Sequence, residues 1–271
     1  MTESNIVEAK NDGRVEVTLN KSIIYQFLST CFLEPDENTI SVLKDNAYRR
    51  CVEEASHGYL NSYEMSSEMN VLKSGLKEIL KYLDGIGLEE MGKEYGRLFG
   101  IHLIAEDCPT CESFYGTVDV FQLTNELADI SGFYNAFGLM CSDELKERLD
   151  NLGVELEFMH FLSYKEAYAL ENDGEEKAAL CLDGEKKFLK EHLGRWAGHF
   201  SSLVEKKTKG GGIYLSLARF LKGFISLEMR YLDVEAEETS KLNMSIFKEK
   251  DEAFACDFSA KTVDNKEGIP C

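Results

Sequence analysis

Hydrophobic side chains recur at three- and four-residue spacing along most of this chain, which is the period of one face of an α-helix. The first such face follows a polar stretch at the N-terminus and comprises Ile23, Ile24, Phe27, Leu28, Cys31 and Phe32. Pro35 should end this helix, and Asp36 can cap a second one. The polar segment 57–67 predicts a loop before the next helix.

Two more helices and one irregular segment are predicted in the middle of the chain. An apolar face spans residues 69–83 and closes at Asp84-Gly85, where glycine is typical of a helix end. Residues 88–99 form the next helix. The segment GIHLIAEDCPTC, residues 100–111, lacks helical periodicity, so we expect a loop there.

The next two helices are predicted from the same spacing of apolar side chains. The aromatic-rich stretch 112–137 predicts a largely buried helix with a break near Gly132. Ser142 or Asp143 can cap the following helix, whose apolar face spans residues 145–159.

The C-terminal part contains three further helical patterns. Two helices fit residues 175–206, and the three glycines at 210–212 mark the turn after them. A last helix spans about 212–233. No two-residue hairpin turn lies between alternating strands and no segment repeats, so helices packed on helices are the expected architecture.

We therefore predict an all-α, single-domain bundle of about nine helices. The helical domain should extend over residues 19–235. A flexible arm, residues 1–18, should precede it. A flexible polar tail, residues 236–271, should follow it and carries Cys256 and Cys271.

The charge of the chain limits the kinds of partner it can have. Its 49 acidic and 30 basic side chains give a formal charge of −19, which repels nucleic acid and anionic membrane surfaces. The same charge favours a basic partner, although a charged surface that only keeps the protein soluble would have the same composition. No stretch approaches the roughly 20 apolar residues that span a bilayer, and the polar start lacks the core of a secretory signal. We expect a cytoplasmic protein with no stable membrane insertion and no nucleic-acid partner.

Signatures of enzymes are absent from the sequence. It contains no GxSxG nucleophile elbow, no GxxxxGK[ST] phosphate loop and no GxGxxG motif after a strand. Two E-x-x-H pairs, Glu54/His57 and Glu157/His160, have the spacing of a di-iron bundle site. Such pairs arise readily by chance among 49 acidic residues. We predict a non-catalytic protein without a cofactor, and a di-iron enzyme is the least favoured alternative.

Cys108 and Cys111 form a C-x-x-C pair, whose spacing is shared by zinc knuckles and redox dithiols. The βαβ surroundings of a redox dithiol are missing from the predicted fold. A structural zinc would need two more ligands, for which Cys256 and Cys271 are available. The simpler interpretation is two reduced cysteines where the loop meets a helix, so the pair is a weak candidate for a metal site.

Five segments of the chain resemble, in order, the motifs of one family. They are IIYQFLSTCFLEPDENTISVL, EYGRLFG, CPTCESFYG, DNLGVELEFMHFL and FLKEHLGRWAGHF, and they lie between residues 20 and 233. This family comprises the TorD/DmsD/NarJ-type redox-enzyme maturation chaperones. Each motif alone is weakly specific, but the five motifs in this order are fairly specific for the family.

The resemblance implies an all-helical cytoplasmic chaperone with no chemistry of its own. Such a chaperone binds the twin-arginine signal peptide, or the apoprotein, of a molybdopterin oxidoreductase and assists cofactor insertion and assembly before export. Its receptor surface needs apolar side chains near acidic groups, and Phe114, Tyr115 and Phe158 are candidates for the apolar part. An assembly subunit that binds only the mature apoenzyme is the alternative, and a homodimer is compatible with either role.

The resemblance also implies which residues bind the peptide. The loop-to-helix motif matches the proline, glutamate, serine and tyrosine of the family at Pro109, Glu112, Ser113 and Tyr115. Asp150 matches the aspartate of an Asp-His pair in the family, but the next position holds Asn151, which cannot become cationic near neutral pH. A structural role for Asp150 and Asn151 in linking two helices is an equal alternative.

The cysteines should not be needed for the fold, because the helical faces supply a core of ordinary size without a metal. A Cys108→Ser, Cys111→Ser double variant should keep the helical circular dichroism and the cooperative melting of the parent. Stoichiometric zinc or iron in the purified parent, together with loss of folding in the variant, would contradict this expectation.

Overall fold

The computed structural model describes residues 3–63, 67–100, 108–116, 120–139, 147–237 and 239. Within these ranges the chain forms ten α-helices, one short 3-10 helix and no strand, so the all-α prediction is confirmed. No helix in this part of the chain is both long and apolar enough to cross a membrane. The elements are α1 (Glu3–Phe32), α2 (Glu37–Lys44), α3 (Asn46–Asn61), α4 (Ser67–Gly85), α5 (Leu88–Phe99), η1 (Glu112–Phe114), α6 (Val120–Ala136), α7 (Leu152–Asn172), α8 (Glu175–Glu191), α9 (Leu193–Lys207) and α10 (Ile213–Tyr231).

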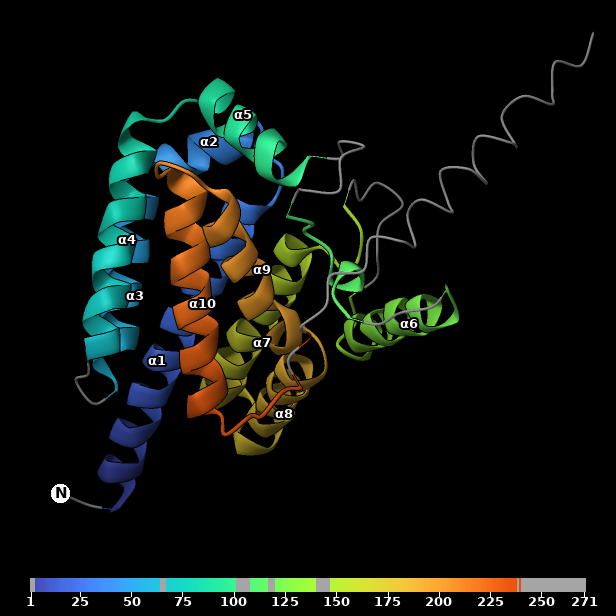
Figure 1. Ribbon diagram of the computed structural model, residues 1–271. Helices are drawn as coiled ribbons and strands as arrows, with labels where there is room; N and C mark the ends of the chain where they lie inside the picture. Colours follow the sequence, from blue (N-terminus) through green and yellow to red (C-terminus); the bar gives the residue numbers. More distant parts are fainter. Residues whose placement is uncertain are drawn as a thin grey trace, which may run out of the picture.

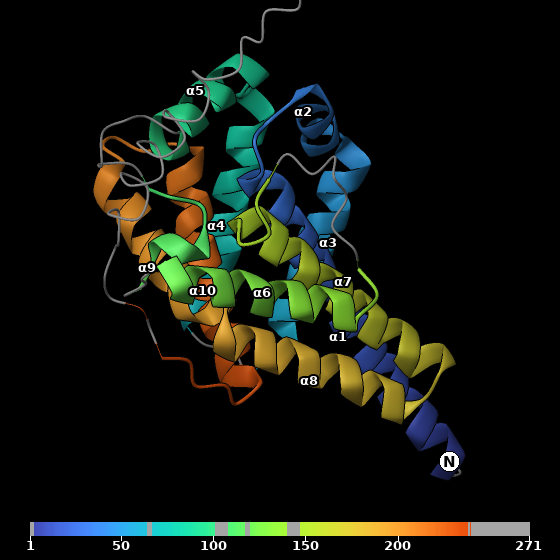
Figure 2. The same cartoon turned by 90° about the vertical axis from the view of Figure 1, so that its right-hand side faces the viewer.

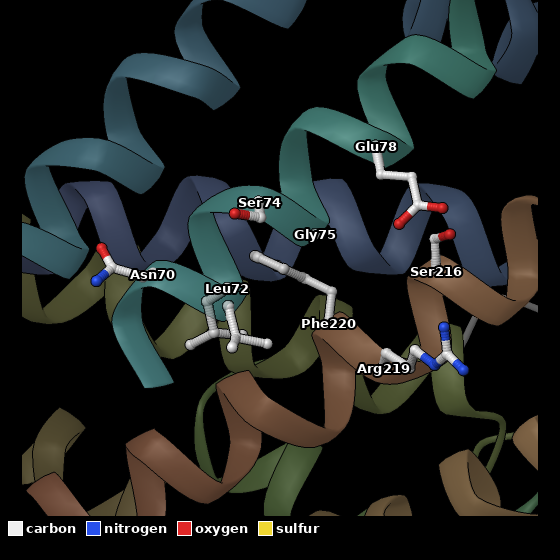
Figure 3. Close-up of a pocket in the computed structure, with 9 residues that line it drawn as sticks. Asn70, Leu72, Ser74, Gly75, Glu78, Ser216, Arg219 and Phe220 are labelled. Atoms are coloured by element: carbon white, nitrogen blue, oxygen red, sulfur yellow. The ribbon is translucent and has the colours of Figure 1, made fainter. Parts of the chain in front are cut away.

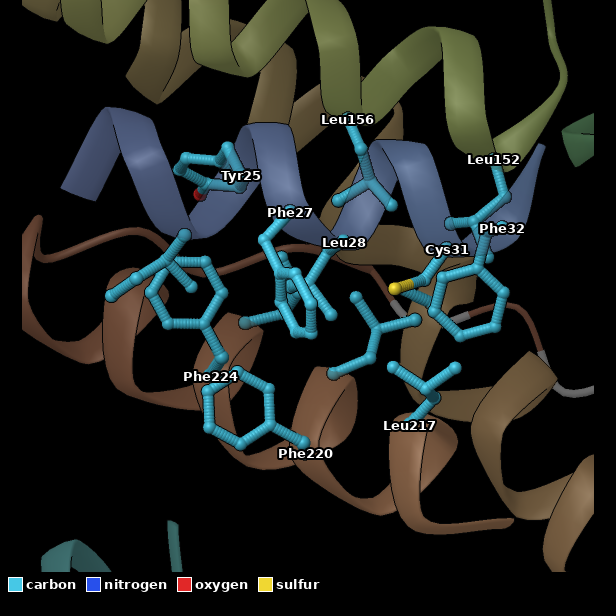
Figure 4. Close-up of a cluster of buried hydrophobic side chains, with 14 of the residues drawn as sticks. Tyr25, Phe27, Leu28, Cys31, Phe32, Leu152, Leu156, Leu217, Phe220 and Phe224 are labelled. Atoms are coloured by element: carbon cyan, nitrogen blue, oxygen red, sulfur yellow. The ribbon is translucent and has the colours of Figure 1, made fainter. Parts of the chain in front are cut away.

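The helix α1 runs through the centre of the bundle. In Figure 1, α3 and α4 lie on one side of it, α10 lies beside it, and α7, α8 and α9 lie on the other side. Figure 4 shows α1 between α7 and α10, with Phe27, Leu28 and Phe32 on the side that faces α10. Rings meet edge-on there, with centroid distances of 4.9 Å between Tyr25 and Phe224 and 5.6 Å between Phe32 and Phe200. The apolar pattern that predicted this helix therefore forms the middle of the core.

Several helix boundaries agree with the sequence predictions. Asp36 is the N-cap of α2, and its Oδ1 accepts a hydrogen bond from the Thr39 amide at 2.7 Å. The helix α4 closes at Gly85, and α5 has the predicted bounds. The helices α8, α9 and α10 occupy the three ranges predicted for the C-terminal part. These boundaries depend on caps and turns that are local in sequence.

The first helix begins earlier than predicted. The expectation of an arm outside the helical domain over residues 1–18 is corrected, because α1 already begins at Glu3. Val15 packs against a small apolar cluster at the turn between α7 and α8. Arg14 Nη1 also lies 2.6 Å from Glu175 Oε1. These contacts are distant in sequence, so the pattern of this polar stretch did not reveal them.

The predicted loop over residues 57–67 is wrong for its first part, because α3 continues to Asn61. Tyr59 is fully buried inside this stretch. Gly58 lies against α1, where an added Cβ would stand 2.5 Å from Asn20 Nδ2. The glycine that suggested a helix end instead allows two helices to approach each other.

The single helix predicted over residues 112–137 is also wrong. The short helix η1 ends before Tyr115, whose backbone is extended, and α6 begins only at Val120. Within α6 the chain continues through Gly132 without the predicted break. The first residues of this range are instead held by long-range contacts described below, which prevent a continuous helix.

The helix α7 begins at Leu152, later than the predicted start near residue 145. Its N-cap is Asn151, whereas the predicted caps Ser142 and Asp143 lie outside the described residues. The residues just before α7 pair with the loop that carries the two cysteines. Residues 149 and 150 form a turn, and Asn151, which pairs with Cys111, has an extended backbone, so these residues do not extend the helix.

Only the start of the predicted C-terminal tail is described, at residues 236, 237 and 239. The Thr239 amide donates to the Arg195 carbonyl at 2.9 Å, and His199 Nδ1 lies 2.8 Å from the Thr239 carbonyl oxygen. The chain after α10 therefore returns to α9. The rest of the tail, with Cys256 and Cys271, lies outside the described residues.

A group of charged side chains is buried between α1, α7, α8 and α10. Lys21 pairs with Glu185, and its Nζ lies 3.4 Å from Glu166 Oε2. The Tyr25 hydroxyl donates to Glu228 Oε2 at 3.3 Å. Burial raises the pKa of both Glu185 and Glu228 to about 7, despite the nearby ammonium group. One cation thus faces three acidic side chains, and full ionisation of all three is unfavourable in this site.

Replacing Glu228 with glutamine should stabilise the protein at high pH much more than at low pH. Folding raises the pKa of this carboxyl group to about 7, so its stabilising effect is complete below the ordinary carboxyl range and is lost as the pH rises through 7. Glu228→Gln should therefore gain roughly 1–3 kcal/mol in free energy of unfolding at pH 8 and change little at pH 5.

Thermal unfolding at these two pH values tests this expectation. Glu171→Gln, the same change at an exposed position of α7, is the matched control. Equal effects of Glu228→Gln at both pH values would show that this carboxyl group does not titrate with folding.

Candidate functional site

The loop that carries the two cysteines lies beside the start of α7. We call the paired segments the loop–helix joint, which comprises residues 108–116 and 147–151. Their backbones form an isolated antiparallel bridge between Cys111 and Asn151. The Glu112 amide donates to the Asp150 carbonyl at 2.8 Å. The joint thereby holds η1 and the first turn of α7 together.

Asp150 is at the centre of the joint and is 1% exposed. Arg148 donates to both of its carboxylate oxygens, from Nε to Oδ1 and from Nη2 to Oδ2, each at 2.9 Å. The Ser113 amide donates to Oδ2 at 3.2 Å, and Arg148 Nη2 also donates to the Ser113 hydroxyl at 2.8 Å. A bidentate ion pair inside the protein therefore already occupies this carboxylate.

Asn151 begins α7 and ties it to the loop. Its Oδ1 accepts from the Gly153 amide at 2.8 Å, which is the hydrogen bond of an N-cap. Its Nδ2 donates to Thr110 Oγ1 at 3.2 Å and to Glu147 Oε2 at 3.0 Å. This is the linking geometry considered as the structural alternative for Asp150 and Asn151.

Tyr115 connects the joint to α9. Its hydroxyl donates to the Pro109 carbonyl at 2.8 Å. Its ring centroid lies 5.1 Å from that of Trp196 and 5.4 Å from that of His199. The side chain is buried, so its hydroxyl and its ring both serve contacts within the protein.

Glu112 extends the joint to the turn between α8 and α9. Its Oε2 lies 3.0 Å from His192 Nδ1 and its Oε1 lies 3.8 Å from Arg195 Nη1. Glu155 of α7 is buried nearby and accepts from the Trp196 indole N–H at 3.0 Å. Burial first, and then the charge of Glu112, raises the pKa of Glu155 well above its ordinary value. A proton held by Glu155 allows the two carboxyl groups to lie close together.

The helix α6 covers the Glu112–His192 pair from outside. Asp129 Oδ2 lies 3.4 Å from His192 Nε2, and the Phe133 ring packs edge-on against the imidazole at 5.2 Å. Burial, together with the charge of Glu112, raises the pKa of Glu126 on the same helix. The site thus contains a histidine between two carboxylates, one from the joint and one from α6.

The structure brings together all six residues predicted for peptide binding, and it buries each of them. They are Pro109, Glu112, Ser113, Tyr115, Asp150 and Asn151. Direct contact with a ligand therefore requires that a covering element moves, and peptide binding by these residues stays a prediction.

Sequence reasoning missed the partners of these residues on other elements. They are Arg148, Glu155, His192, Arg195 and Trp196. All but Arg148 lie within the segments DNLGVELEFMHFL and FLKEHLGRWAGHF, which carry the resemblance. Membership of those segments was the one signal that could have identified them.

Cys108 and Cys111 are free thiols and are buried. Burial raises the pKa of Cys111, which opposes formation of the thiolate that redox chemistry and metal binding need. Within the described ranges no three His, Cys, Asp or Glu side chains are grouped as a metal site. Both glutamates of the E-x-x-H pairs, Glu54 and Glu157, are exposed and do not point into the bundle.

A hollow of about 400 Å³ lies elsewhere, between α4 and α10 (Figure 3). Its lining includes apolar Leu72 and Phe220, the small Gly75, and the oppositely charged Glu78 and Arg219. Neither segment of the joint contributes to it, and none of the predicted site residues lies in it. We therefore place the candidate site at the joint and the α8–α9 turn.

Comparisons with known proteins found one family model, one curated relative and one solved structure that are similar to this chain. The family model described as nitrate reductase delta subunit matches residues 64–202. The chain is 31% identical over 116 residues to the perchlorate reductase assembly chaperone protein of Dechloromonas aromatica (strain RCB), which covers 41% of this chain and 46% of that protein. The chain thus spans about half the length of this curated relative. A crystal structure described as a redox enzyme maturation protein from Archaeoglobus fulgidus is 20% identical, with 76% of this chain and 93% of that chain covered and a TM-score of 0.46.

Asn151→Ala should lower the free energy of unfolding by roughly 1–2 kcal/mol. The variant loses the N-cap hydrogen bond of α7 and the two side-chain hydrogen bonds to Thr110 and Glu147. Asn151→Ser should recover part of this loss, since a serine can accept from the Gly153 amide but is too short to replace the donations to Thr110 and Glu147. Urea unfolding measures both variants. An alanine variant as stable as the parent would show that this residue does not determine the start of α7.

Proposed function

This chain belongs to the nitrate reductase delta subunit family, and from that premise we propose that it is an assembly chaperone for a molybdopterin oxidoreductase. In this role it binds the apoprotein, or the twin-arginine leader of the apoprotein, while the cofactor is inserted, and it catalyses no reaction. We place this work in the cytoplasm, before export of the client. The observation that carries the proposal is the family match over residues 64–202, a range that includes the loop–helix joint and the α8–α9 turn.

The charges of the chain support a basic, apolar ligand. A twin-arginine leader combines a basic pair with an apolar run, so its receptor needs a carboxylate near an apolar surface. The net charge of −19 favours encounter with such a leader. Glu112 is a better contact for an arginine than Asp150, because Arg148 donates to both Asp150 oxygens at 2.9 Å, whereas the only arginine near Glu112 among the described residues, Arg195, lies 3.8 Å from its Oε1. We assign the contact to Glu112, whereas Asp150 and Asn151 hold the joint in place.

A second candidate function is an assembly subunit that binds only the mature apoenzyme. The burial of all six predicted residues favours this alternative, because neither the Glu112 nor the Asp150 carboxylate is open on the surface. The two functions differ in one property: a leader-binding chaperone loses its client when the leader is removed, whereas an assembly subunit does not.

Calorimetric titration should detect binding of the leader peptide of an oxidoreductase encoded in the same genome. Glu112→Gln should weaken this binding about tenfold or more and keep the helical circular dichroism, because a charge-assisted bond is replaced by a neutral one. Glu191→Gln makes the same change at an exposed position beside the α8–α9 turn and should bind like the parent.

Salt should slow association of the leader more than it weakens the final complex, since apolar burial supplies most of the affinity.

Binding of the mature apoenzyme by a protein that binds none of the leaders would contradict the leader-binding function. The assembly-subunit function would then replace it.

A further inference from the structure

The second half of α6 and the residue that follows it carry an apolar stripe. Ile130, Phe133 and Tyr134 lie in α6, Phe137 directly follows its last residue, and the four have the spacing i, i+3, i+4 and i+7. Ile130 and Tyr134 are buried, and Phe133 and Phe137 are half-buried. This is the pattern by which an amphipathic helix docks on an apolar surface of a partner.

The helix rests on α7 and α8 through aromatic rings. Ring centroids lie 4.7 Å apart for Tyr134 and Phe158 and 5.4 Å apart for Phe133 and Phe188. In the described part of the chain, α6 is not among the helix pairs whose backbones pack closely. Figure 2 shows it lying across the face of the bundle, and Figure 1 shows it to one side. Large side chains therefore bridge a gap that backbone packing does not close.

Gly184 of α8 forms a notch for one of these rings. A Cβ at this position would lie 2.6 Å from Phe137 Cζ, so the ring fits only because the side chain is missing. Glycine inside a helix is less stable than alanine, so the notch weakens α8. We call the surface made by Phe158, Gly184, Phe188 and His192 the α6 seat.

One charge of α6 suits this position poorly. The helix carries two acidic side chains, Glu126 and Asp129, and no basic one. Asp129 Oδ2 lies 3.4 Å from His192 Nε2, whereas Glu126 meets the like charge of Glu112. An apolar helix with an arginine at that end would replace a repulsion by an attraction.

We infer that α6 is the resident occupant of the client-binding surface, and that an apolar helical segment of the client, with an arginine beside it, displaces α6 from the α6 seat. The inference rests on the proposed function and locates the apolar run of the leader on Phe158, Gly184 and Phe188. It also explains the burial of Glu112, which α6 covers until a client replaces it. The apparent affinity for the client is then reduced by the small fraction of molecules in which α6 is released.

Two variants release α6 but differ in the seat they leave. Phe137→Ala removes the ring from α6 and leaves the seat unchanged. Gly184→Ala fills the notch, so that neither α6 nor an inserted client side chain fits. Gly198→Ala in α9 is the matched control, because an added Cβ meets nothing within 4 Å there. Amide hydrogen exchange over residues 120–136 should rise in the first two variants and not in the control.

Binding of the fluorescein-labelled leader peptide then separates the outcomes. Phe137→Ala should bind at least about tenfold tighter than the parent, Gly184→Ala should bind more weakly, and Gly198→Ala should bind like the parent. Phe133→Ala, a second change on α6, should act like Phe137→Ala if that variant does not fold. Equal leader affinities in all these proteins would overturn the inference and leave the proposed function intact.

A labelled peptide with the sequence of residues 120–139 tests the α6 seat without a client. It should bind Phe137→Ala and fail to bind Gly184→Ala. If this peptide binds but the leader binds none of the proteins, the proposed leader-binding function fails while the exchangeable seat stands. If neither peptide binds Phe137→Ala, α6 is a permanent part of the fold and the inference is overturned.

Discussion

The backbone pairing between Cys111 and Asn151 anchors the start of α7 and, through it, the candidate site. Each residue of an α-helix turns by about 100° from the one before, so an anchor at one end determines the direction of every later side chain. Anchored there, α7 turns Glu155 toward the Trp196 indole and places His160 Nδ1 2.8 Å from Ser22 Oγ of α1. The same pairing keeps the preceding loop in place, so the joint connects the core of the bundle to its candidate site.

Two of the buried charged groups differ in what encloses them. Lys21 and its glutamates lie between four helices of the core, where any change in packing would leave a buried charge without its partner. The pair formed by Glu112 and His192 is contacted on its outer side by α6. The Lys21 group therefore favours a single arrangement of the bundle, whereas the Glu112–His192 pair lies beneath one docked helix, α6.

This difference fits the work proposed for the protein. A chaperone must hold its client and afterwards release it, and an intramolecular occupant favours release because its effective concentration at the seat is high. An acidic α6 competes weakly for the α6 seat against a basic, apolar client. Once the client folds, this weak binding is enough for α6 to return to the seat. The notch at Gly184 receives the ring of Phe137, which also packs against the core residue Phe158.

The all-helical class and most helix boundaries could be predicted from the sequence, and the sequence also carries the resemblance to the family. Asp36 caps α2, and α4, α5, α8, α9 and α10 follow apolar periodicity, because these features depend on neighbours a few residues away. The resemblance also selected the residues of the joint, since each motif is a short stretch of the chain.

The starts of α1 and α7 became clear only from contacts in the folded protein. The same is true of the ion pair between Arg148 and Asp150, and of the contact between Glu112 and His192 across 80 residues of sequence. The tertiary structure also decided that α6 lies over the Glu112–His192 pair. Contacts between distant segments leave no periodic signal in either segment, so no local pattern could have predicted them.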